Sequence, residues 1–127
     1  MKNKMNFAAL LAMLLIAAPV FAQKVNEKVM TRAQNRIDNM CQTVKIDEAA
    51  KQEAVNLTYA VFTEKAKLGN QKSNNQISEE EYKIEDKKVT DEYWKNLTGL
   101  IPKDQLAVYK EWRSKPGKER DAAPNKE

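Results

Sequence analysis

Apolar residues recur every three or four positions beyond residue 24, which is the spacing of an amphipathic helix. This spacing predicts a first helix from about 24 to 43, and Asp47 can then cap a second helix. The second helix is expected to reach about Leu68, with Gly69 as its C-cap and a polar loop over 70–76. The two apolar stripes are Val25, Val29, Ala33, Ile37, Met40, Cys41 and Val44, and then Ala50, Ala54, Leu57, Val61 and Leu68.

Two further helices are expected in the second half of the chain. Ser78 and Glu81 have the spacing of a capping box, so a third helix begins there. Pro102 suits the first turn of a fourth helix, which ends before Pro116. No segment alternates in the manner of a strand. We therefore predict an all-α fold of four helices, in which the second and third form a long antiparallel hairpin flanked by shorter first and last helices.

The N-terminus has the pattern of a secretory signal. Two lysines precede an apolar run over residues 7–20, and Val20 and Ala22 supply small residues at the −3 and −1 positions before Gln23. A retained membrane anchor is the alternative, but the run is shorter than the roughly 18 to 20 residues that span a bilayer. We predict that residues 1–22 are a signal peptide cleaved between Ala22 and Gln23. The protein is then periplasmic or secreted, with no membrane insertion after cleavage.

Charge and composition limit the classes of partner that the processed chain can bind. We expect one helical domain over 23–116 and a disordered polar tail over 117–127, because the tail lacks apolar anchors. The whole chain has 22 basic and 18 acidic residues, and loss of the leader's two lysines lowers the net charge from +4 to +2. Both signs are interleaved, whereas nucleic-acid binding needs a clustered basic patch. We therefore expect no nucleic-acid partner.

Residue types that commonly carry catalysis are scarce. The chain has no histidine and one cysteine, and this composition excludes nucleophile–imidazole pairs, conventional zinc sites and haem-attachment sequences. The carboxylates stand among lysines on expected helix surfaces, where they serve solubility and local pairing. We predict no enzyme activity, no catalytic residue, no metal and no cofactor. Cys41 is a small buried residue, a free thiol or an intermolecular bridge.

Aromatic residues gather in the second half of the chain, and two interpretations compete. Either these rings pack on the stripe of the second helix as core, or some remain exposed and bind apolar segments of other proteins. The candidate protein-binding residues are Tyr82, Tyr93, Trp94, Tyr109 and Trp112.

One short segment suggests a family. The segment Ile101-Pro102-Lys103-Asp104-Gln105 resembles the Leu-Thr-x-x-Gln motif of the Spy/CpxP-like periplasmic family, with Ile for Leu and Pro for Thr. An apolar residue docks the turn, Pro102 starts the helix, and Gln105 is expected to bond back across this turn. The segment Ile46-Asp47-Glu48-Ala49-Ala50 resembles a degenerate first copy, in which Ala50 replaces the glutamine.

The resemblance covers about residues 25–114 and implies a function. In that family, two such motifs bracket a long helical hairpin, and protomers form a curved homodimer whose concave surface is associated with chaperone-like client binding or stress sensing. It implies a non-enzymatic holdase or envelope-stress adaptor that binds unfolded or envelope proteins. The alternative is a structural or partner-specific helical module without chaperone activity, whose aromatic residues are all core. The first copy lacks its glutamine, and the histidines of metal-sensing relatives are missing.

Overall fold

The computed structural model describes residues 25–123, and within that stretch the chain is helical and contains no strand. The expected all-α fold is thus confirmed, whereas the predicted signal peptide, residues 1–22, lies outside the described residues. The elements are α2 (Glu27–Met40), α3 (Glu48–Ser73), α4 (Glu79–Thr98), the 3₁₀ turn η2 (Lys103–Gln105), α5 (Leu106–Arg113) and α6 (Gly117–Arg120).

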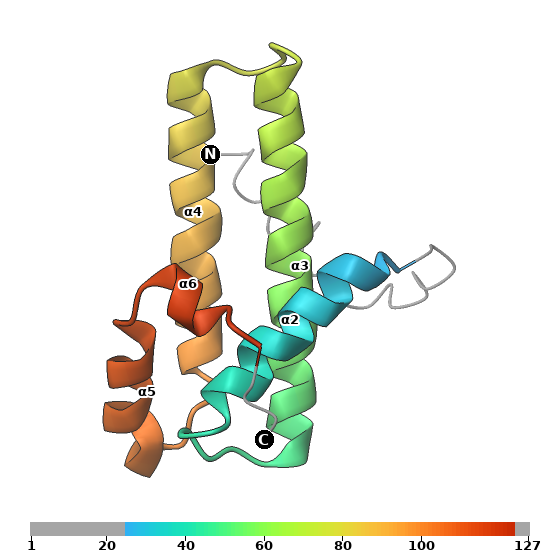
Figure 1. Ribbon diagram of the computed structural model, residues 1–127. Helices are drawn as coiled ribbons and strands as arrows, with labels where there is room; N and C mark the ends of the chain where they lie inside the picture. The colour runs from blue at the N-terminus through green and yellow to red at the C-terminus, as the bar shows by residue number, and fades with distance from the viewer. Residues whose placement is uncertain (1–24, 124–127) are drawn as a thin grey trace.

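The long antiparallel hairpin is formed by α3 and α4, which pack side by side (Figure 1). Helix α2 crosses the first half of α3, and α5 and α6 lie beside the end of the hairpin opposite its turn (Figure 1). The predicted second and third helices are therefore the hairpin, and the shorter helices gather at one end of it. The turn end of the hairpin extends beyond them (Figure 1).

Side-chain caps fix the starts of the three longest helices. Asn26 Oδ1 accepts from the Lys28 and Val29 amides at 3.1 Å, and α2 begins at Glu27 rather than at residue 24. Asp47 caps α3 as predicted. The capping box at the start of α4 is also confirmed: the Ser78 hydroxyl oxygen accepts from the Glu81 amide at 3.0 Å, and the Glu81 carboxylate accepts from the Ser78 amide at 2.9 Å. Such caps satisfy amides that have no partner within the helix.

The predicted end of the second helix at Gly69 is wrong. Helix α3 continues through Gly69, and the chain reverses instead at Asn75, which has a φ of 59°. The Gln76 amide donates to Gln71 O at 2.8 Å and the Asn75 amide to Lys72 O at 3.0 Å, which is the Schellman pattern of helix termination. Asparagine tolerates the left-handed conformation, so the helix continues past Gly69 and ends at Ser73, two residues before Asn75.

The core lies where α2 and α5 pack against the end of the hairpin. Ile37, Met40, Leu97 and Tyr109 are almost fully buried there. Burying a large apolar side chain contributes roughly 1.5 to 3 kcal/mol each, so this end holds most of the hydrophobic stabilisation. Toward the turn of the hairpin, over residues 63–92, Leu68 is the only buried apolar residue.

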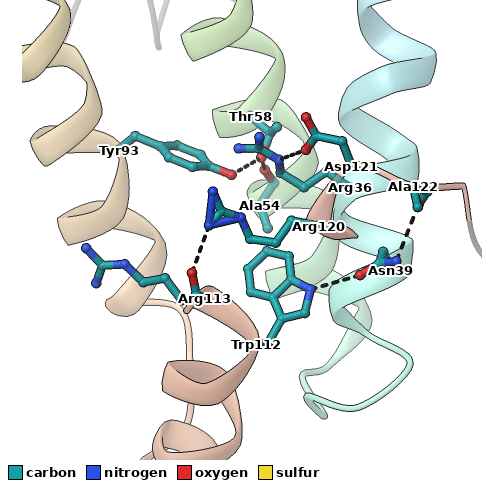
Figure 2. A network of polar contacts seen from close by, with 10 residues as sticks. All are labelled: Arg36, Asn39, Ala54, Thr58, Tyr93, Trp112, Arg113, Arg120, Asp121 and Ala122. Atoms are coloured by element: carbon teal, nitrogen blue, oxygen red, sulfur yellow. Dashed lines mark hydrogen bonds and ion pairs between the residues drawn. The ribbon is translucent and has the colours of Figure 1, made fainter. Parts of the chain in front are cut away.

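The prediction of a disordered tail from residue 117 does not hold for residues 117–123. They include α6, which packs on α2. The contact is polar: Arg36 Nε donates to Asp121 Oδ1 at 2.7 Å, and Asn39 Nδ2 donates to Ala122 O at 3.3 Å (Figure 2). A search for apolar anchors misses this attachment because the anchor is a carboxylate that neutralises a buried arginine.

Candidate functional site

The two motif-like segments lie at the same end of the molecule and are joined by a side chain. Gln105 Oε1 accepts a hydrogen bond from the Lys45 amide at 2.8 Å, although the two residues are 60 positions apart. Lys45 immediately precedes Ile46, the first residue of the degenerate copy. Gln105 therefore ties the α4–α5 connection to the α2–α3 connection.

The expectation that Gln105 bonds back across its own turn is wrong. That turn is closed by the backbone, because the Gln105 amide donates to Pro102 O at 2.8 Å. The glutamine side chain is consequently free to reach the other connection. Pro102 is exposed and precedes η2, so the proline starts a 3₁₀ turn and α5 follows only at Leu106.

The remaining motif residues have structural roles. Ile101 is buried in the core and Ile46 is half-buried against it, which anchors both connections. Asp47 Oδ1 accepts from the Ala50 amide at 2.8 Å as the cap of α3. The residue just before the degenerate segment, Lys45, thus provides the amide donor, and Gln105 in the other segment provides the acceptor.

Three of the five candidate protein-binding aromatics belong to the core. Tyr93, Tyr109 and Trp112 are each at most 3% exposed. Their polar atoms have partners inside the molecule: the Tyr93 hydroxyl is 2.9 Å from Thr58 Oγ1, and Trp112 Nε1 donates to Asn39 Oδ1 at 2.9 Å (Figure 2). These side chains cannot reach a partner protein in this conformation, so for them the core interpretation is correct.

Tyr82 and Trp94 remain half-buried at the surface. The Lys72 ammonium lies 4.6 Å from the Tyr82 ring centre near the turn of the hairpin. The guanidinium groups of Arg113 and Arg120 lie 4.7 and 5.0 Å from the Trp94 ring, in positions that favour attraction between cation and ring. Both aromatic residues therefore sit in basic surroundings.

Sequence reasoning missed a pocket of about 410 Å³, which we call the arginine pocket. It is formed by α2, α3, α4 and α6 and lies beside the buried Tyr93. The signal in the sequence is the i, i+4 pair Arg32 and Arg36, whereas Arg120 comes from the segment that was expected to be disordered. Its lining includes four cations and two aromatic rings: Arg32, Arg36, Lys65 and Arg120, with Phe62 and Trp94.

The arginines of this pocket stack on its rings. Arg32 lies 4.3 Å and Arg36 4.8 Å from the Phe62 ring centre. Burial acts to lower the pKa of Arg36, but its hydrogen bond to Asp121 and the nearby Tyr93 outweigh burial, and the net pKa is raised. Burial, together with the charge of Arg36, lowers the pKa of Arg120. Both groups remain cationic because arginine titrates far above neutral pH.

Cys41 is half-buried as the C-cap of α2, and its thiol is free within the described residues 25–123. Burial raises the pKa of this thiol, and the nearby Lys51 acts in the opposite direction. Among residues 25–123, no three side chains of the types His, Cys, Asp and Glu gather as metal ligands would. No helix in the same stretch is long and apolar enough to cross a membrane.

No protein-family model matches the chain, and comparison with curated proteins and with solved structures found no match.

Proposed function

We propose that the chain is an exported, non-enzymatic helical protein that binds unfolded or envelope proteins reversibly, as the Spy/CpxP-like family does. The observation that carries this proposal is the bond of Gln105 to the Lys45 amide, which joins the two motif-like connections at one end of the hairpin. In that family, two such motifs bracket a long helical hairpin. The long hairpin of α3 and α4, bracketed by these connections, further supports the proposal.

Part of the amphipathic surface remains available for clients. Tyr82 and Trp94 are half-buried at the surface beside cations, whereas Phe62 is buried under two arginines at the arginine pocket. Mixed apolar and charged surfaces suit weak, reversible contacts, because burial of a few rings contributes affinity and long-range charge speeds encounter. The client surface is smaller than five free aromatics would give, since three of them are core.

Light scattering of an aggregating protein tests the proposal. The exported, processed protein is added in stoichiometric amounts to chemically denatured model clients upon dilution. We expect scattering to fall for several clients of unrelated sequence, whereas an equal amount of an inert helical protein leaves it unchanged. Scattering that is unaffected for every client would refute holdase activity.

The burial of Tyr93, Tyr109 and Trp112 favours a second candidate, a structural or partner-specific module without general chaperone activity. This module would leave denatured clients unprotected and bind one folded partner. Capture from the envelope fraction of the source cell, followed by reconstitution with the purified partner, distinguishes it from the first candidate.

Export and dimerisation are parts of the first proposal that have their own tests. If the chain is processed between Ala22 and Gln23, the intact mass of the purified protein equals that of residues 23–127. A mass that includes residue Met1 would contradict export by cleavage. A curved homodimer predicts twice the chain mass by light scattering coupled to size exclusion, and the monomer mass at the working concentration would contradict it.

A further inference from the structure

The arginine pocket carries more positive charge than its acidic neighbours balance. Its lining has no carboxylate, and its cations are Arg32, Arg36, Lys65 and Arg120. Asp121 pairs with Arg36, and Asp86 Oδ1 lies 3.0 Å from Lys65 Nζ. The other two cations form no ion pair within residues 25–123. Two positive charges at the pocket are therefore available to an anion from outside.

Arg120 is the least satisfied of these cations. Its Nε is shielded from solvent and has no hydrogen-bond partner within the described residues, while its Nη1 donates to Arg113 O at 2.8 Å (Figure 2). Asp121 acts to raise the pKa of Arg120, but burial and the charge of Arg36 outweigh it, so a further negative charge would stabilise this guanidinium. An anion in the pocket would offset this cost through its charge, without contact to Nε itself.

Aromatic rings hold the guanidinium groups of the pocket in place. Phe62 supports Arg32 and Arg36, and Trp94 supports Arg120, so the guanidinium planes are held against apolar surface. A stacked guanidinium keeps its edge free, and this edge matches the two oxygens of a carboxylate. Within the molecule, Arg36 already pairs with a carboxylate through a single bond from its Nε to Asp121 Oδ1.

We propose that the arginine pocket binds a carboxylate carried by a small apolar or aromatic body. Its volume of about 410 Å³ falls within the range of small-molecule sites. The same chemistry is offered by a free organic acid and by an acidic residue next to an apolar one in a peptide. The carboxylate binds the unpaired arginines, and the apolar body contacts Trp94 and Ala66, which also line the pocket.

Titration followed by nuclear magnetic resonance tests this binding, with phenylacetate as the probe and phenylacetamide as its neutral counterpart. We expect saturable shifts confined to the pocket for phenylacetate, and much weaker shifts for the amide. Arg32→Gln removes one exposed, unpaired guanidinium and should raise the dissociation constant about tenfold. Lys67→Gln is the matched control, because Lys67 is exposed on α3 and does not line the pocket.

Each result decides the proposal. No saturable shift with phenylacetate, or equal weakening by Arg32→Gln and Lys67→Gln, overturns it, since the latter would mean nonspecific charge attraction. A short peptide with adjacent Phe and Glu, compared with its Phe-Gln version, shows whether a peptide source also fits. The inference does not depend on holdase activity: a protein that suppresses aggregation but ignores phenylacetate keeps its proposed function and loses this pocket.

Discussion

Replacing Gln105 by alanine tests whether the two connections are held together by its side chain. The bond from the Lys45 amide to Gln105 Oε1 is 2.8 Å long, and it spans 60 residues. A neutral hydrogen bond contributes about 1 kcal/mol net, and the released amide lies at the surface where water can replace the lost acceptor. For a domain of this size, a loss of about 1 kcal/mol lowers Tm by about 4 to 8 °C.

Thermal and urea unfolding, followed by far-ultraviolet circular dichroism, measure this effect. Gln42→Ala is the matched control, because Gln42 is exposed in the α2–α3 connection, and it should shift stability by less than about 0.5 kcal/mol. Gln105→Glu keeps a side-chain oxygen for the Lys45 amide and should retain most of the stability. If Gln105→Ala behaves like Gln42→Ala, the side chain does not join the connections and our reasoning is refuted.

Three further outcomes follow from buried polar groups and from the thiol. Thr58→Val should cost about 1 to 3 kcal/mol by leaving the buried Tyr93 hydroxyl without an acceptor, but far less in a Tyr93→Phe background; additive costs in urea unfolding would contradict the coupling. Asp121→Ala should cost about 1 to 2 kcal/mol, discounted for the partial exposure of the carboxylate, and should speed amide exchange in α6; unchanged exchange would mean that Arg36 does not hold this helix. Burial raises the pKa of Cys41, so less thiolate is present near pH 8, and alkylation should be slower in the folded than in the urea-unfolded protein; equal rates would contradict this.

The sequence specified the hairpin well because its signals are local. Helical spacing and the Ser78 capping box act within a few residues, and both are confirmed. The end of α3 was mispredicted because glycine within a helix costs only about 1 kcal/mol relative to alanine, which the long apolar stripe offsets. The chain instead leaves the helix at Asn75, which has a positive φ, and asparagine adopts this conformation less often than glycine does.

The site was less predictable because it depends on contacts between distant segments. Gln105 was singled out by its motif, but its partner Lys45 cannot be found from spacing along one helix. Arg120 and Asp121 were assigned to a polar tail, although Arg120 lines the arginine pocket and Asp121 attaches the α6 segment to Arg36 on α2. The candidate aromatics could not be divided into core and surface either, because that division depends on which rings α2 and α5 cover.

The most direct test of the proposed client binding measures a fluorescently labelled, permanently unfolded protein by anisotropy. Reduced and carboxymethylated α-lactalbumin is titrated with the chain lacking residues 1–22, and the native form of the same client is the control. Our account predicts a saturable rise in anisotropy with the unfolded client, reversed by unlabelled competitor, and little rise with the native form. No rise with the unfolded client, or an equal rise with both forms, would contradict it.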